Sequence, residues 1–464
     1  MSESIALPKG LTVDGELWVQ FHPAAQALIT QMHDMIQLQQ KRIEALEARL
    51  AQHSQNSSRP PSSDLPGNRP PADRRKRPGK PGARRGHRGR GQRLLAATET
   101  IDVKPDSCPC GQALFATTEP YYTHQVIELP PIEVSVRHWV LHRARCAACG
   151  CVVKAAPPPD QTTGYGPRLS ALIGELAGIY GTSRRLVQAF CTSVLRVPIS
   201  LGTIQKVLDR VSLAISPHYE AIASEARQAP VAYIDETPWY RQGSLEWLWT
   251  MVSDRVAFYM INARRSKAAF FALIEQWAGI LVSDGYGVYQ NWVSQRQTCL
   301  AHLIRTARGL SERRDPVLSA CGRWAMAELK RLCQMAHAPP TGGAWLAWYG
   351  RLCRLIGHYH DRQDDAGRFV RRLLREMDSL WVFLSHHGVD TTNNRAERAL
   401  RYGVTWRKRS QGTSSDKGNA WVQHILSLRE TCRLRGMPTY EVLVDAVDSL
   451  FTDRQPNLAW ISQS

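Results

Sequence analysis

Hydrophobic residues recur with a seven-residue period near the start of the chain, within residues 24–52. The two interleaved rows of this repeat are Ile29, Ile36, Ile43 and Leu50, and Met32, Gln39 and Leu46. The spacing predicts a helix that carries the seam of a coiled coil, and the polar Gln39 weakens such a coil or sets its register. Two interpretations follow: the helix mediates self-association, or it packs on its own domain.

Short apolar runs between residues 228 and 302 have the length and flanks of β-strands. The predicted strands are 231–235, 246–254, 256–262, 280–284 and a short strand from 297 that runs into a helix. Asp254 and Arg255 lie at the turn of a predicted hairpin, and a helix is predicted over 267–279. Because strands are followed here by a strand-helix-strand unit, we expect a mixed sheet with helical cover and a multidomain α/β chain.

Helical patterns account for most of the remaining chain. Ser183 and Ser200 are placed to cap helices over 184–195 and 201–215, and this pair resembles a helix-turn-helix within a helical region at 160–220. Many helical pairs share the pattern, so an ordinary helical pair is the alternative. Residues 303–390 are predicted to be helical without strands, and further helices are expected at 393–402 and within a C-terminal segment at 419–464.

The chain carries a strong positive charge that is unevenly distributed. Its 464 residues have a formal net charge of +18 at pH 7, and a field of this sign favours polyanions such as nucleic acid. Within residues 59–93, twelve Lys or Arg stand against two Asp. Residues 54–99 lack apolar periodicity, so we expect a disordered basic arm that contacts phosphates without sequence preference. A basic protein with no such partner is the alternative.

Two cysteine clusters lie within residues 100–156. Their members are Cys108 and Cys110, followed by Cys146, Cys149 and Cys151. Paired cysteines next to a glycine form the knuckles of tetrahedral zinc sites. The first cluster has one intervening residue where two are usual, and Cys151 offers an alternative ligand. We expect a zinc-ribbon-like module with structural Zn²⁺ on Cys108, Cys110, Cys146 and Cys149, with free thiols as the alternative.

Three carboxylates stand out by their local context. Asp235 and Asp284 each follow an apolar strand pattern, and Glu397 lies in a basic helix. If the fold gathers them, they form an all-oxygen site that suits Mg²⁺ or Mn²⁺, and two such ions can catalyse phosphodiester transfer. The structural alternatives are an Asp exposed in a turn, a supporting role for one member of the pair Asp235 and Glu236, and a salt-bridged Glu397 on a helix face.

Several sequence strings together resemble the insertion-sequence-66 family of bacterial DDE transposases over nearly the full length. They are Gln55-Asn-Ser-Ser-Arg-Pro-Pro-Ser-Ser-Asp64, Gly86-His-Arg-Gly, the cysteine clusters, Asp235-Glu-Thr-Pro238, Asp284-Gly-Tyr-Gly-Val-Tyr289, Cys299-Leu-Ala-His302 and Asn393-Asn-Arg-Ala-Glu397-Arg. The first and last of these strings are highly specific together. The chain departs from the family at its first cysteine cluster, where the family usually has two intervening residues.

The resemblance implies an RNase H-like core over 228–410, interrupted by a helical insertion at about 310–390. It implies a transposase that cuts and joins DNA at the ends of its element, with Asp235, Asp284 and Glu397 as the catalytic, metal-binding triad. A DNA-binding regulator and a nuclease that does not join strands are the alternatives. For Cys299 and His302 a structural or DNA-positioning role follows, beside simple packing. The arginines expected to contact DNA phosphates are Arg84, Arg85, Arg88, Arg395, Arg398 and Arg401.

Partners and location are also expectations at this point. The partners are element-end and target DNA, with accessory proteins of the same element. No run of eighteen apolar residues occurs and the start lacks a secretory pattern. We therefore expect a location in the bacterial cytoplasm with the nucleoid, where the eleven cysteines stay reduced.

Overall fold

The computed structural model describes residues 5–6, 12–13, 15–57, 64, 93–161, 163–292 and 294–463. Most of the predicted basic arm, including Arg84, Arg85 and Arg88, lies outside these residues. Near the start, β1 (Ile5–Ala6) pairs with β2 (Thr12–Val13), and α1 (Gly15–Gln20) follows. Among the described helices, none combines the length and apolar character that a membrane span requires.

A five-stranded sheet forms the centre of the structure. Its strands are β5 (Val231–Arg241), β6 (Ser244–Val252), β7 (Ala257–Asn262), β8 (Ile280–Ser283) and β9 (Arg296–Thr298). Their order is β7-β6-β5-β8-β9, with antiparallel pairing among β5, β6 and β7 and parallel pairing of β8 and β9. The mixed sheet predicted from the apolar runs is therefore confirmed.

The predicted end of the first strand at Asp235 is wrong, because β5 continues to Arg241. Its partner β6 pairs with it from Tyr233 through Arg241, whereas the parallel partner β8 pairs only from Val231 to Tyr233. Between Tyr233 and the bridge of Arg241 to Thr413, this edge of β5 has no strand partner, and a proline such as Pro238 is tolerated there. The connection to β6 is a two-residue hairpin turn, Gln242 and Gly243, both with positive φ.

Helices cover both faces of the sheet. On one face, α13 (Asn394–Ser410) and α14 (Asp416–Arg435) pack on Tyr233, Trp239 and Tyr259. On the other face lie α6 (Ser216–Ala226) and α7 (Lys267–Ile274), with the short α8 (Gly287–Gln290) and α16 (Ala459–Ser462). Helix α7 ends at Ile274, five residues before its predicted end at Gly279, because Glu275 adopts a positive φ of 50°.

The segment between β9 and α13 is helical, as predicted, and builds its own core. It contains α9 (Leu300–Ser311), α10 (Pro316–Gln334), α11 (Gly342–Tyr359) and α12 (Asp365–Arg375), with 3-10 turns at Met377–Ser379 and Val382–Leu384. Leu329, Trp348 and Leu352 are fully buried in this core. The insertion is therefore a packed unit attached to the end of the sheet rather than an extended loop.

A second helical body precedes the sheet. It comprises η3 (Pro159–Gln161), α3 (Pro167–Gly174), the π-helical turn η4 (Glu175–Ile179), α4 (Arg184–Ser193) and α5 (Leu201–Ala214). The predicted caps are confirmed, because Ser183 Oγ accepts from Leu186 N at 3.3 Å and Ser200 Oγ accepts from Thr203 N at 3.1 Å. These helices share one core with α14 and with α15 (Thr439–Phe451) near the end of the chain.

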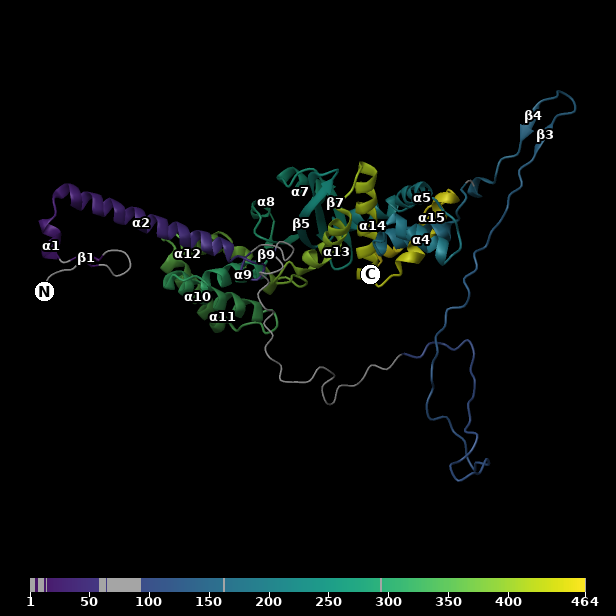
Figure 1. Ribbon diagram of the computed structural model, residues 1–464, viewed down its shortest axis with the longest axis horizontal. Coiled ribbons are helices and arrows are strands. Elements are labelled where there is room, and N and C mark those ends of the chain that lie inside the picture. Colours follow the sequence, from purple (N-terminus) through teal and green to yellow (C-terminus); the bar gives the residue numbers. More distant parts are fainter. Residues whose placement is uncertain are drawn as a thin grey trace.

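The N-terminal helix projects from the side of the insertion, and the cysteine-bearing segment projects from the opposite end of the molecule (Figure 1). Helix α2 (Pro23–Leu50) confirms the predicted helix and has no buried residue, so its apolar seam is exposed and the coiled coil stays a prediction. Residues 93–158 form a long extended segment that ends in a hairpin of β3 (Arg143–Arg145) and β4 (Val152–Lys154).

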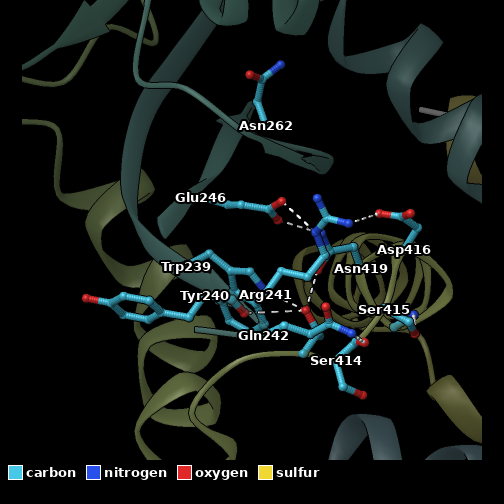
Figure 2. A network of polar contacts seen from close by, with 12 residues as sticks. Trp239, Tyr240, Arg241, Gln242, Glu246, Asn262, Ser414, Ser415, Asp416 and Asn419 are labelled. Carbon is cyan, nitrogen blue, oxygen red and sulfur yellow. Dashed lines mark hydrogen bonds and ion pairs between the residues drawn. The ribbon is translucent and has the colours of Figure 1, made fainter. Parts of the chain in front are cut away.

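A polar network joins the tip of the β5–β6 hairpin to the loop between α13 and α14 (Figure 2). Arg241 pairs with the buried Glu246 and with Asp416, each at 2.7 Å, and Asn419 donates to Glu246 at 2.7 Å. At Gly412 an added Cβ would lie 2.0 Å from the carbonyl oxygen of Tyr240, so only glycine allows this approach. The network anchors the C-terminal end of α13 to the far end of β5.

Candidate functional site

The two aspartates stand side by side on adjacent parallel strands. The last parallel pair of β5 and β8 is Tyr233 with Val282. Asp235 and Asp284 each follow two residues later, so an equal rise along both strands brings them to the same level. The alignment arises because the two strands pair in this register, and the 49 positions between the residues do not predict it.

Asp235 is a carboxylate whose charged neighbours are other carboxylates. Loss of hydration, and then the charges of Glu236, Asp284 and Glu397, raise the pKa of Asp235 well above its ordinary value, against a hydrogen bond from the Glu236 N–H. Glu236 is 9% exposed and is committed elsewhere, because its carboxylate bonds the Arg265 guanidinium and the Tyr289 hydroxyl. Of this neighbouring pair, Asp235 is therefore the carboxylate available to the site. Glu236 instead ties β5 to Arg265 and Tyr289.

Asp284 is surrounded by cations and by its own backbone. Its Oδ1 accepts from the Tyr286 N–H at 2.8 Å. Burial raises the pKa of Asp284, while that hydrogen bond and the charges of Arg265, Arg372 and Arg296 oppose the rise. The Arg372 guanidinium packs closely on Gly285, where an added Cβ would lie 1.9 Å from its nitrogen and would displace it. The three arginines lower the local cost of placing carboxylates together.

Glu397 reaches the site from the first turn of α13. Its side chain is 34% exposed, and its Oε1 lies 3.3 Å from Arg305 NH2 and 3.8 Å from His302 Nε2 of α9. The salt-bridged alternative considered for Glu397 is thus realised, but with α9 instead of the arginines of its own helix. Its charge nevertheless contributes to the raised pKa of Asp235, so both Asp284 and Glu397 lie within electrostatic reach of Asp235.

Cys299 and His302 belong to the same neighbourhood. Cys299 follows β9, and its Sγ, a His302 ring nitrogen and a Glu397 oxygen all lie within 4.8 Å of one another, the sole such group of three among the described residues. Burial raises the pKa of Cys299 to about 11, and burial with the Arg305 charge lowers the pKa of His302 to about 4. Both side chains are therefore neutral near pH 7. His302 thus adds no positive charge that would compete with a cation for the carboxylates.

Asn393 joins the three elements, a role that the sequence analysis missed. It is fully buried; its Nδ2 donates to the Ile234 carbonyl at 2.9 Å, and its N–H donates to Cys299 Sγ at 3.2 Å. Asparagine at the start of a helix is commonly a cap, but the Asn393 side chain makes no capping bond. It instead fixes the start of α13, and so Glu397, beside the residue that precedes Asp235.

Replacing Asn393 with alanine is expected to lower the free energy of unfolding by about 1–3 kcal/mol, because the Ile234 carbonyl loses its buried donor. Urea unfolding of the full chain measures this change. Asn394→Ala is the matched control, since Asn394 is exposed on the next turn position and should change the free energy by about 0.5 kcal/mol or less. Equal stability of the two variants would contradict the bridging role.

The arginines of α13 divide into two kinds. Arg395 is already engaged: its Nε lies 2.7 Å from Asp390 Oδ2, and its guanidinium stacks 4.9 Å from the Tyr233 ring centre. Arg398 and Arg401 are exposed, and no carboxylate of the described chain lies within ion-pair distance of either. Near Glu397, the latter two therefore present unoccupied guanidinium groups in the described part of this helix.

Each cysteine cluster forms a tight turn with preorganised thiols. Gly111 N donates to Cys108 O at 2.8 Å and Gly150 N to Cys146 O at 2.9 Å, and both glycines have positive φ. Hydrogen bonds from the Gln112 backbone and Cys108 lower the pKa of Cys110, and bonds from Cys151 and Cys146 lower the pKa of Cys149. The turns fit zinc half-sites. The two halves do not meet within the described structure, where no four-cysteine group forms.

The site can hold hard divalent cations. Asp235, Asp284 and Glu397 offer oxygen ligands. Burial, and then the repulsion among carboxylates, raise the pKa of Asp235, and a bound cation would relieve that repulsion. Arg305 and Arg372 supply positive charge at its edge. Such a site suits chemistry at phosphorus.

Comparisons with known proteins identify the family. The family model described as "Transposase IS66 family" matches residues 183–420, just over half of the chain, and "zinc-finger binding domain of transposase IS66" matches residues 105–150. A family of unknown function matches residues 19–93.

Two relatives come from Sinorhizobium fredii (strain NBRC 101917 / NGR234). "Uncharacterized protein y4jD" is 22% identical over 75% of this chain and 76% of its own length. "Uncharacterized protein y4jO" is 27% identical over 36% of this chain and 51% of its own length. These names assign no activity, so the family models carry the identification. With the transposase model covering the sheet, the insertion and Glu397, this chain belongs to the IS66 family of transposases.

Proposed function

We propose that this transposase cleaves DNA strands at the ends of an insertion sequence and joins the freed ends to target DNA, with Asp235, Asp284 and Glu397 as its catalytic residues. The observation that carries the proposal is the convergence of three carboxylates from two parallel strands and a distant helix, expressed in the raised pKa of Asp235. Structural acids are usually paired with bases, whereas the charged groups that act on Asp235 are other carboxylates.

The cofactor of this site is Mg²⁺ or Mn²⁺, held as a two-ion centre by the same three residues. When bound, two such ions activate an attacking oxygen and stabilise the leaving oxygen at phosphorus. The chain's own groups do the positioning: Asn393 holds α13 against β5, and Arg372 keeps the Asp284 loop close. Structural Zn²⁺ on Cys108, Cys110, Cys146 and Cys149 is proposed for the extended module, with Cys151 as an alternative ligand.

The domain organisation follows from the same proposal. The sheet order β7-β6-β5-β8-β9 supports an RNase H-like core over 228–410, and the separate core of α9–α12 supports the helical insertion at about 310–390. We assign the helical region 160–220 to DNA binding, together with the C-terminal segment 419–464 that shares its core. Residues 100–156 form the zinc-ribbon-like module.

The partners are element-end DNA and target DNA, with the basic arm at 54–99 and the exposed Arg398 and Arg401 as phosphate contacts. Self-association through α2 is proposed because its seam is exposed: Ile36 is 48% and Ile43 49% accessible, and Leu46 is also exposed. Accessory proteins of the same element are further expected partners. The expected location is the bacterial cytoplasm, at the nucleoid.

Strand transfer is the decisive test. Purified full-length protein is incubated with Mg²⁺ or Mn²⁺, a supercoiled plasmid and DNA ends whose 3′ hydroxyls are already exposed, the end sequences being taken from repeats that flank the gene. The expected result is covalent joining of the 3′ ends to the plasmid, seen as a labelled product on denaturing gels. Hydrolysis without joining would identify a nuclease, and binding without either reaction would identify a regulator.

A further inference from the structure

The turn after α2 is docked on the first helix of the insertion. Within residues 52–57, Asn56 is 8% exposed and both of its amide atoms have partners. Its Oδ1 accepts from His53 N at 2.8 Å, and its Nδ2 donates to Ala51 O at 3.1 Å and to Glu312 Oε2 at 2.7 Å. Because Glu312 is the residue at the end of α9, Asn56 links the turn to that helix directly.

Gly309 in α9 makes the docking close. A Cβ at this position would lie 2.3 Å from the carbonyl oxygen of Asn56, and the next two nearest atoms also belong to Asn56. Glycine weakens a helix interior relative to alanine. Its presence in the third turn of α9 is therefore explained by the approach of the Asn56 backbone.

The docked turn completes a pocket beside the catalytic glutamate. The pocket has a volume of about 460 Å³ and is lined by Ser54, Gln55, Ala301, Ile304, Arg305, Arg308 and Glu397. This volume is in the range of small-ligand sites and accommodates a nucleotide unit. Two walls come from segments about 250 positions apart in the chain, and the third is a residue of the proposed triad.

The charges in the pocket favour an anion. The Arg305 guanidinium forms an ion pair with Glu397, with 3.3 Å between NH2 and Oε1. No carboxylate in the described part of the chain lies within 4.0 Å of Arg308. Two guanidinium groups thus face one carboxylate. A guanidinium with free N–H donors matches the oxygens of a phosphodiester, and the side-chain amide of Gln55 adds a neutral donor.

The basic arm begins at the rim of this pocket. Ser54 donates through its N–H to Asp64 Oδ1 at 2.9 Å and through its hydroxyl to Asp64 Oδ2 at 2.5 Å. Eleven of the twelve basic residues within 59–93 follow Asp64 in the sequence. The turn therefore sets the starting point of the arm next to Glu397, where a positively charged tether concentrates DNA.

We propose that residues 52–57 are part of the DNA-binding surface of the catalytic domain, and that with Arg305 and Arg308 they form a subsite for a backbone phosphate of the strand that enters at Glu397. This inference rests on the proposed function, since it names a contact with the DNA that the carboxylates would cleave. It gives the segment matched by the family of unknown function a role in placing substrate.

Arg308→Gln tests the subsite directly. Binding of the full-length protein to an element-end duplex with a single-stranded 3′ tail is measured in EDTA by fluorescence anisotropy over a range of salt. Affinity should fall by about tenfold at low salt, and the slope of log K against log salt should decrease by about 0.7–0.9, the value for one phosphate contact. Arg354→Gln is the matched control, because Arg354 is exposed on α11 and also lacks an ion-pair partner in the described chain.

Gly309→Ala tests the docked turn without removing any charge. The added Cβ should displace Asn56, so hydrogen exchange of residues 51–57 should accelerate and DNA affinity should fall about three- to tenfold. Gly350→Ala in α11 is the control, since its Cβ would have no neighbour within 4 Å. An alanine favours helix at both positions, so a general loss of folding is not expected and thermal unfolding checks it.

Wild-type DNA affinity in both Arg308→Gln and Gly309→Ala overturns the subsite. Loss of affinity in Gly309→Ala alone, with Arg308→Gln unchanged, also overturns it, since the turn would then act without the phosphate contact. Both measurements are made without divalent ions and do not depend on catalysis. Failure of the strand-transfer test would therefore remove the proposed chemistry and leave these binding results to be judged independently.

Discussion

Replacing Asp284 with asparagine is expected to reduce metal-dependent cleavage of element-end DNA roughly a thousandfold or more, which corresponds to about 4 kcal/mol of transition-state free energy. Asparagine retains the volume of the side chain and an oxygen that can accept from Tyr286 N, so the loop keeps its hydrogen bond. It removes the negative charge that a hard cation requires. DNA binding should persist, because the variant loses an acid and leaves every basic residue in place.

Cleavage of a labelled end fragment and DNA binding in EDTA are compared for Asp284→Asn and wild type. Asp361→Asn serves as the matched control, since its side chain is 98% exposed on the insertion and, among the described residues, forms its one ion pair with His360. The control should cleave at the wild-type rate. Undiminished cleavage by Asp284→Asn would exclude this residue from the catalytic set and with it the proposed triad.

Replacing Asp235 with asparagine is expected to abolish cleavage and to raise the unfolding temperature of the metal-free protein. The pKa of Asp235 is raised in the folded chain, so the native state binds more protons than the unfolded state above the unfolded value of about 3.9. The stability that the Asp235 carboxyl contributes to the wild-type protein therefore falls as the pH rises from about 3.9 through the raised pKa. Asparagine does not titrate, and each pKa unit of difference is worth about 1.4 kcal/mol.

Thermal unfolding at pH 5 and pH 8, with EDTA or with Mn²⁺, measures this effect. The advantage of Asp235→Asn over wild type should grow from pH 5 to pH 8 in EDTA. Mn²⁺ at about 100 times its dissociation constant should stabilise wild type by about 2.7 kcal/mol, and the variant much less. An unchanged pH dependence would contradict the raised pKa of Asp235. Equal stabilisation of both proteins by Mn²⁺ would contradict its role as a metal ligand.

The local patterns predicted the elements but not the contacts between them. Ser183 and Ser200 cap helices because their hydroxyls bond backbone N–H groups three residues away, an interaction contained within a short segment. The register that aligns Asp235 with Asp284 depends on pairing between β5 and β8, and the length of β5 depends on β6. These pairings bring together residues that no local periodicity relates, so the strand end at Asp235 was predicted wrongly.

The same division applies to the site and to the N-terminal segment. Residue identity and resemblance were enough to select Asp235, Asp284, Glu397, Cys299 and His302. The pairing of Glu397 with Arg305, the bridge through Asn393 and the fit of Asn56 against Gly309 each join residues more than 80 positions apart. The helix α2 is predicted by its seven-residue repeat. The exposure of its apolar seam depends on the tertiary structure, in which no described segment buries that seam.

The amino-acid sequence by itself determined which segments are helices and strands, where the positive charge lies and which side chains can bind a cation, because propensity, charge and ligand type are properties of single residues and their near neighbours. The tertiary structure alone decided which carboxylate is available, which arginine is unpaired and which segment borders Glu397. Those properties depend on burial and on distances between remote residues, and only the folded chain sets both.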